Sequence, residues 1–121
     1  MVLRDKYHDL HYSEMGVQPI EVMQAILSKT QFIGFLYGNV VKYHLRAGHK
    51  DGESYRKDLE KRDRYLQWLY CAWILGNYIN PKALYPKPPI EFISDVINCI
   101  DHKVNWLKKC QQIINSGRAE E

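Results

Sequence analysis

Four of the five prolines in this 121-residue chain fall within ten residues, from Asn80 to Pro89, in the stretch NPKALYPKPP. Proline has no backbone N–H and disfavours helical geometry in the residue before it, so this stretch cannot be helical. The sequence therefore predicts an extended, proline-rich connector over residues 80–89.

Apolar residues at helical spacing predict an all-α fold, a small bundle of about four helices. The first helix begins at Pro19, because proline suits the first helical position. The second begins after a cap at Ser28 or Thr30 and runs to about Ala47. Gly48 then stands where a helix commonly ends in a left-handed turn.

The third helix is predicted to start at a Ser54 cap and to run to about Leu75 or Tyr78. Its first half is strongly charged, whereas residues 66–75 are apolar on nearly every side and must be covered on more than one face. The tryptophans of the chain fall in apolar helical stripes, which indicates core positions or an oligomer contact: Trp68, Trp73 and Trp106.

The fourth helix is predicted from about Ile90 to Asn115, within residues 90–116, and Gly117 should end it. Its apolar residues recur at helical spacing: Phe92, Val96, Ile97, Ile100, Val104, Leu107, Cys110, Ile113 and Ile114.

The composition, 45% hydrophobic and 26% charged, is that of a soluble globular protein, and the length suits a single domain over residues 1–121. A domain this small gains from self-association, so we expect a homo-oligomer. The net charge of +3 permits anionic ligands but is too mild for a dedicated nucleic-acid binder.

Three cysteines without a CxxC pair, Cys71, Cys99 and Cys110, are predicted to be buried free thiols in a reducing compartment. The N-terminal stretch lacks the apolar core of a signal peptide, and the longest apolar run is too short to cross a bilayer. We therefore expect a cytoplasmic protein with no membrane partner.

The most informative run is Gly38 to Lys50, GNVVKYHLRAGHK. Asn39, Lys42 and Arg46 share one helical face, and Lys50 follows the turn. One interpretation is a solvated helix end, where cations are favourable in any case. The other interpretation is a binding site for phosphate oxygens. A buried Asn39 needs a partner, which a base edge, a phosphate or a neighbouring backbone could supply.

Gly34 and Gly38 lie mid-helix, where each is less favourable than alanine by about 1 kcal/mol. Their spacing of four leaves a smooth groove on one side of the helix. The groove is explained either by close helix–helix packing or by room for a bound nucleotide, and the two are compatible.

Asp58, Lys61 and Arg62 form helical pairs that on their own indicate an exposed surface. If the third helix packs antiparallel to the second, however, Asp58 faces Lys42 or Arg46 and orients it.

Several chemistries are disfavoured by the absence of their motifs. The five histidines show neither HxxxH nor HExxH spacing, so we expect no metal site. There is no GxxxxGK[ST] P-loop. Glu60 and Asp63 give one acidic pair, but no matching cluster precedes it, so two-metal phosphate hydrolysis is poorly supported.

The combined pattern HY…PIEV…GNxxKYxxRAGxK…DLxK, over residues 8–69, resembles an uncharacterised bacteriophage domain family. That family is similar to the C-terminal part of the small nucleotide kinase of short-tailed coliphages, which phosphorylates deoxynucleoside monophosphates without a P-loop. The resemblance implies a nucleotide-binding core over residues 8–69. The resemblance does not include the extra N-terminal region of the kinase. Residues 76–121 of this chain have no counterpart in the pattern.

The resemblance marks eight positions as nucleotide-site residues: His11, Tyr12, Asn39, Lys42, Arg46, Lys50, Asp58 and Lys61. In a kinase, Lys42 and Arg46 would be catalytic and would offset charge on the transferred phosphoryl group. Lys50 would hold a phosphate of the donor ATP, while Asn39 and Tyr12 would orient the base or sugar of the nucleoside monophosphate. No other cofactor is implied.

Three functions are compatible with these observations. The first is a P-loop-independent nucleoside monophosphate kinase of a phage. The second is a non-enzymatic sponge that sequesters nucleotide second messengers of bacterial anti-phage immunity, such as cyclic dinucleotides or ADP-ribose-type signals. The third is an inhibitor of a host protein, in which the basic cluster is only surface.

Overall fold

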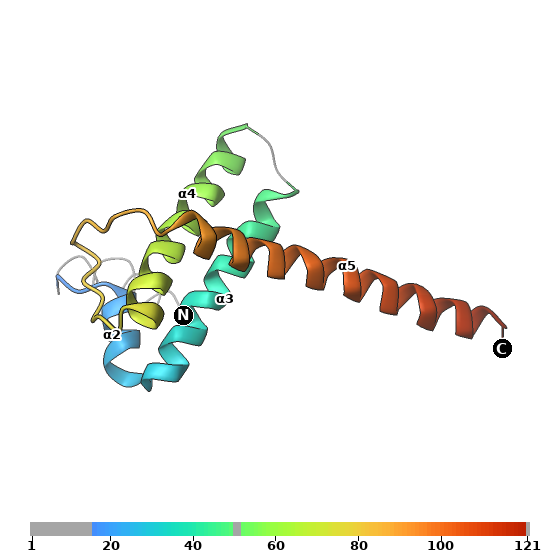
Figure 1. Ribbon diagram of the computed structural model, residues 1–121, viewed down its shortest axis with the longest axis horizontal. Helices are drawn as coiled ribbons and strands as arrows, with labels where there is room; N and C mark the ends of the chain where they lie inside the picture. Colours follow the sequence, from blue (N-terminus) through green and yellow to red (C-terminus); the bar gives the residue numbers. More distant parts are fainter. Residues whose placement is uncertain (1–15, 50–51, 121) are drawn as a thin grey trace, which may run out of the picture. The chain divides into compact units, whose positions relative to one another are not determined.

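The computed structural model describes residues 16–49 and 52–120, and over these ranges the fold is all-α (Figure 1). Its helices are α2 (Pro19–Ile26), α3 (Lys29–Ala47), α4 (Gly52–Leu69), the π-helical turn η1 (Tyr70–Ile74) and α5 (Ile90–Glu120). No strand occurs in these described ranges. The chain divides into two compact units, 1–87 and 88–121, which we describe separately.

The starts of α2 and α3 follow the sequence predictions. Pro19 occupies the first turn of α2, where the backbone N–H of Gln18 donates to Glu21 Oε2 at 2.8 Å. Ser28 caps α3: its Oγ accepts from the Gln31 N–H at 3.2 Å, and Gln31 Oε1 accepts from the Ser28 N–H at 2.9 Å. This reciprocal capping box satisfies two backbone donors that would otherwise lack partners.

α3 ends at Ala47 as predicted, but two predicted details of the helix ends are wrong. Gly48 has a right-handed conformation, with φ −65° and ψ −14°, so α3 ends without the left-handed turn. α4 begins at Gly52, and Ser54 lies inside its first turn instead of capping it. The left-handed conformation occurs at Gly52 instead, with φ +64°, because glycine has no side chain to oppose it.

α3 and α4 pack side by side as an antiparallel hairpin, which is the core of the first unit (Figure 1). Leu36 and Val40 of α3 and Leu66 and Leu69 of α4 are fully buried or nearly so. The helical run continues to Ile74, close to the predicted end at Leu75, but its last turn is a π-helix in which the Leu75 N–H donates to Tyr70 O.

The connector is non-helical, as predicted. Ile79, the residue before the connector, is bound to α2 by a pair of hydrogen bonds: Gln24 Nε2 donates to Ile79 O, and the Ile79 N–H donates to Gln24 Oε1, both at 2.9 Å. Ile79 itself is completely buried.

α5 is one continuous helix of 31 residues (Figure 1). The prediction that Gly117 ends it is wrong, since the helix runs on to Glu120. An exposed glycine costs a helix only about 1 kcal/mol, so its presence alone does not terminate one.

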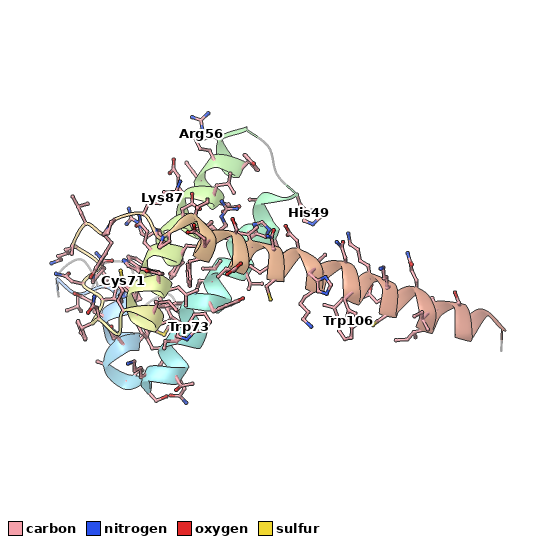
Figure 2. All side chains as sticks on the ribbon, in the orientation of Figure 1. His49, Arg56, Cys71, Trp73, Lys87 and Trp106 are labelled. Atoms are coloured by element: carbon pink, nitrogen blue, oxygen red, sulfur yellow. The ribbon has the colours of Figure 1, made fainter. Side chains whose placement is uncertain are left out.

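Other predictions had mixed outcomes. Among the tryptophans, Trp68 is buried, but Trp73 and Trp106, which Figure 2 labels, are about half exposed. All three cysteines are free thiols. Cys71 is buried, whereas the burial predicted for Cys99 is wrong because that residue is exposed.

Candidate nucleotide-binding site

The candidate site surrounds the ring of Tyr43 on the α3–α4 hairpin. Three cations lie near its centroid: Lys42 Nζ at 4.5 Å, Lys61 Nζ at 5.5 Å and the Arg46 guanidinium carbon at 5.7 Å. Lys42 and Arg46 come from α3, and Lys61 comes from α4. The structure therefore brings three of the eight predicted positions together on one aromatic ring, where cation–π attraction helps to hold them.

Further aromatic rings extend from Tyr43 along α4. Tyr65 stacks on Tyr43 with centroids 5.9 Å apart and planes at 17°, and Trp68 meets Tyr65 edge-on at 5.2 Å. The Arg64 guanidinium carbon lies 5.9 Å from the Trp68 ring. The result is an aromatic wall with positive charge at its margin.

An open pocket of about 330 Å³ lies against this wall. That volume is at the small end of the range for sites that bind small molecules. Its lining comes from one face of α4 plus one residue of α3: Tyr43, Lys57, Glu60, Lys61, Arg64, Tyr65 and Trp68. Three of these seven side chains are basic, and Glu60 is the one carboxylate among them.

The positive charge here is largely uncompensated. Within the described part of the chain, Lys42, Lys61 and Arg64 form no ion pair. Lys57 pairs with Glu53 at 3.5 Å, but both side chains are mostly exposed, so the pair is weak. Cations that lack a carboxylate partner leave a local positive potential that favours an anionic ligand.

Arg46 forms an ion pair with a buried carboxylate, that of Asp58. Its Nε lies 3.8 Å from Asp58 Oδ2, and the Asp58 side chain is 4% exposed whereas that of Arg46 is 48% exposed. The prediction that Asp58 faces an α3 cation across an antiparallel hairpin is confirmed. At 3.8 Å the two groups form an ion pair rather than a hydrogen bond, and about half of the arginine side chain stays exposed.

Of the remaining predicted positions, Asn39 is the one that the structure describes, and it does not join this cluster. Asn39 Nδ2 donates to Phe35 O of its own helix at 2.9 Å, so a neighbouring backbone satisfies the amide. His11, Tyr12 and Lys50 lie outside the described residues.

The predicted groove at Gly34 and Gly38 has no close neighbour. A methyl group added at either glycine would meet no atom within 4 Å. Close packing against the described residues therefore does not explain these glycines, and room for a bound nucleotide stays a prediction.

Sequence reasoning missed Lys57, Arg64 and Trp68 as pocket residues. Their signal was present, since positions 57, 61, 64 and 68 follow one another at spacings of four, three and four on one helical face. Trp68 was predicted to be a core residue or an oligomer contact. It is 7% exposed, but its ring still borders the pocket.

Tyr65 links the pocket to the hairpin core. Burial, together with the neighbouring Tyr43 hydroxyl, raises the pKa of the Tyr65 phenol above its ordinary value of 10.0. Tyr65 therefore remains a neutral, stacked ring at physiological pH.

On α4, Arg62 makes a structural contact. Its guanidinium lies 3.0 Å from His44 Nδ1 of α3, and it also binds Asp63. A guanidinium can only donate, so His44 Nδ1 must accept. This contact joins the two helices and leaves Arg62 unavailable to a ligand.

A second pocket, of about 310 Å³, lies between α2, α3 and the chain after η1. It is lined by Gln24, Leu27, Lys29, Phe32, Ile33, Ala72, Gly76, Asn77 and Tyr78. Lys29 is its one basic residue, so it suits a phosphate group less well than the pocket at Tyr43.

Two kinds of feature are absent from the described residues. No cluster of three or more histidine, cysteine, aspartate or glutamate side chains there could hold a metal ion. None of the helices in those ranges combines the length and apolar character needed to span a bilayer.

Comparison with known proteins places this hairpin in a family. A family described as a protein of unknown function, DUF3310, matches residues 7–67, which is half of the chain. The chain belongs to the DUF3310 family. The matched DUF3310 segment contains α2, α3 and nearly all of α4, and it therefore includes Lys42, Arg46, Asp58 and Lys61.

A curated relative of this DUF3310 protein is the nucleotide kinase gp1.7 of Escherichia phage T7, which is 44% identical over 50 residues. The aligned part is 40% of this chain and 26% of the relative, so the chain spans about a quarter of that protein. The match relates the chain to a phage nucleotide kinase over this segment. No solved structure matches the chain significantly.

Proposed function

We propose that this DUF3310 protein is a phage nucleotide-binding protein that acts in the host cytoplasm. The observation that carries the proposal is the convergence of Lys42, Arg46 and Lys61 on the aromatic wall of Tyr43, Tyr65 and Trp68. A nucleotide combines a flat base with charged phosphates, so an aromatic wall with a cationic margin complements both parts.

In this proposal, the base stacks in the pocket against the exposed edge of the wall, beside Trp68. The phosphates extend toward Tyr43, where Lys42 and Lys61 donate charge-assisted hydrogen bonds. Arg46 presents its guanidinium to the same phosphates while Asp58 fixes its orientation.

The activity we propose first is a P-loop-independent nucleoside monophosphate kinase, because the related phage protein is named a nucleotide kinase. Lys42 and Arg46 would neutralise charge that develops on the transferred phosphoryl group, so that catalysis comes from positioning and electrostatics. Lys50 would hold a donor phosphate of ATP, and His11 and Tyr12 would complete the acceptor side.

This activity is tested by incubating the purified protein with ATP and each deoxynucleoside monophosphate in turn. We expect diphosphate products from at least one acceptor. Arg46→Gln should lower turnover by about 100-fold or more, since a charge on the transferred phosphate would lose its partner. The control is Arg56→Gln, because Arg56 projects from the tip of the hairpin at the start of α4 (Figure 2). A fully active Arg46→Gln variant would refute the catalytic role.

The alternative is a sponge that binds nucleotide second messengers without converting them. The extent of the match favours it, since three-quarters of the kinase has no counterpart in the alignment. Stacking and charge suffice for binding, and no donor site is needed. Calorimetry with cyclic dinucleotides and ADP-ribose-type signals tests this alternative. Tight binding with no diphosphate formed from any acceptor would select the sponge over the kinase.

A further inference from the structure

The helical run of α4 and η1 ends in a tight turn that the proposed nucleotide site does not use. The Asn77 N–H donates to Cys71 O at 2.9 Å, and Gly76, inside this turn, has φ +69°. Glycine adopts this left-handed conformation at no steric cost. The turn lies beside the start of α3, since a methyl group added at Gly76 would be 3.8 Å from Lys29 Nζ. Gly76 and Lys29 both line the second pocket, so the end of this helical run forms one edge of that pocket.

The second pocket, of about 310 Å³, is mainly apolar. Leu27, Phe32, Ile33 and Ala72 supply its hydrocarbon surface. Two of these residues belong to the core as well, because Phe32 is 4% and Ala72 is 5% exposed. Apolar walls with a few polar groups are typical of sites that bind small molecules, and this volume is at the small end of their range. The pocket therefore suits a compact ligand with an apolar body.

The polar groups of this pocket carry a single charge. Lys29 is its one basic residue, and none of its nine lining residues is aspartate or glutamate. Among residues 16–49 and 52–120, Lys29 has no ion-pair partner and the Asn77 side-chain amide makes no hydrogen bond. The ammonium and the amide N–H are both donors, and a carboxylate can accept from both. One cation suits one negative charge, whereas the pocket at Tyr43 has three basic side chains.

We propose that the second pocket binds a small monocarboxylate with an aromatic or branched aliphatic body. The body of this ligand packs on the wall that includes Phe32, and its carboxylate accepts from Lys29 Nζ and Asn77 Nδ2. The second pocket shares no lining residue with the pocket at Tyr43, so this proposal does not depend on the proposed nucleotide function.

The test is a nuclear magnetic resonance titration of the full chain with two probes, hydrocinnamate and its neutral amide. Gly76 is the one glycine of the chain that leucine precedes, so combined labelling of leucine carbonyl carbons and glycine nitrogens identifies its amide signal. Hydrocinnamate should shift this signal with a dissociation constant of about millimolar, as expected of so small a ligand. It should bind about tenfold more tightly than the amide, because the charge-assisted contact is lost in the amide.

The reference signal is that of Gly48, which follows the opposite end of α3. The 19 residues of α3 extend over about 28 Å at 1.5 Å per residue. Neither probe should therefore move the Gly48 signal at concentrations that saturate the shift of Gly76.

Two variants separate the charge of the pocket from its apolar wall. Lys29→Gln should abolish the preference for hydrocinnamate and leave the affinity for the amide within about twofold. Leu27→Ala should weaken both probes by about three- to tenfold, since it removes apolar surface from the wall. The matched control is Lys57→Gln, which removes a cation from the pocket at Tyr43 and should change neither affinity.

Three results would overturn the proposal. The first is a Gly76 signal that neither probe shifts up to its solubility limit. The second is equal affinity of the wild type for hydrocinnamate and its amide. The third is a Lys29→Gln variant that keeps the preference for hydrocinnamate, because the charge would then come from elsewhere.

Discussion

The α3–α4 hairpin and helix α5 are both helical and both rich in apolar residues, but they use them differently. In the hairpin, apolar residues of each helix are buried by the other helix. This packing brings Asp58 next to Arg46 and stacks Tyr65 on Tyr43. In α5, large apolar side chains such as Ile113 and Leu107 are more than half exposed. The comparison teaches that two helices that bury each other's apolar residues can build a site, whereas residues 106–114 of α5 leave large apolar side chains exposed.

The largest difference between the two regions should appear in stability. Leu69 of α4 is completely buried, so Leu69→Ala should lower the free energy of unfolding by about 2–5 kcal/mol. Ile113 of α5 is 72% exposed, and Ile113→Ala should change it by less than about 0.5 kcal/mol. Urea unfolding followed by circular dichroism measures both. Equal losses would break the distinction between the regions.

A smaller effect is expected at the buried carboxylate. Asp58→Ala removes the partner of Arg46 and leaves a small void, so it should destabilise the protein by about 1–3 kcal/mol. Asp95→Ala removes an exposed carboxylate from α5 and should have almost no effect. Thermal unfolding of the two variants provides the comparison. If the two variants have the same unfolding temperature, Asp58 does not stabilise the hairpin.

Binding should distinguish the tryptophans of the two regions. Trp68 borders the pocket, whereas Trp106 belongs to α5. A bound nucleotide should quench tryptophan fluorescence in the wild type, and Trp68→Phe should lose most of this quenching and weaken affinity by about three- to tenfold. Trp106→Phe should retain both the quenching and the affinity. Quenching that is lost in Trp106→Phe would contradict the assignment of the nucleotide site to the α3–α4 hairpin.

The smallest expected effect is a dependence of stability on alkaline pH. The folded-state pKa of Tyr65 is raised above 10.0, so folding favours the neutral phenol. The resulting stabilisation is complete below pH 10 and is lost as the pH rises through the folded-state pKa. Since α5 contains no tyrosine, this loss belongs to the first unit. Unfolding of the wild type and of Tyr65→Phe at increasing pH should show the loss only in the wild type.

Much of the fold could be predicted from local sequence. Pro19 and the Ser28 cap define the starts of α2 and α3, and the proline cluster defines the connector, because these residues act on their own backbone. Helix ends were less predictable. Gly48 follows the last residue of α3 but does not adopt the left-handed conformation, and Gly117 does not end α5. The π-helical turn at Tyr70 left no local signal.

The candidate site was predictable only where chain spacing fixes neighbours. Lys42 and Arg46 share α3, and the antiparallel hairpin brings Asp58 to Arg46 as expected. The position of the pocket was not predicted, because it depends on how Tyr43 of one helix meets Tyr65 and Trp68 of the other. Asn39 was assigned to the ligand, but its amide donates to the Phe35 carbonyl, a choice that sequence alone left open.

The central claim is that the cations around Tyr43 bind the phosphates of a nucleotide. Calorimetric titration of ATP and of each nucleoside monophosphate into the wild type, the double variant K42Q/K61Q and the control K82Q/K87Q tests it most directly, because Lys82 and Lys87 lie in the connector (Figure 2 labels Lys87). We expect binding to the wild type and the control, and a loss of about 100-fold in affinity in K42Q/K61Q, since two charge-assisted contacts disappear. Undiminished affinity in K42Q/K61Q would contradict the account.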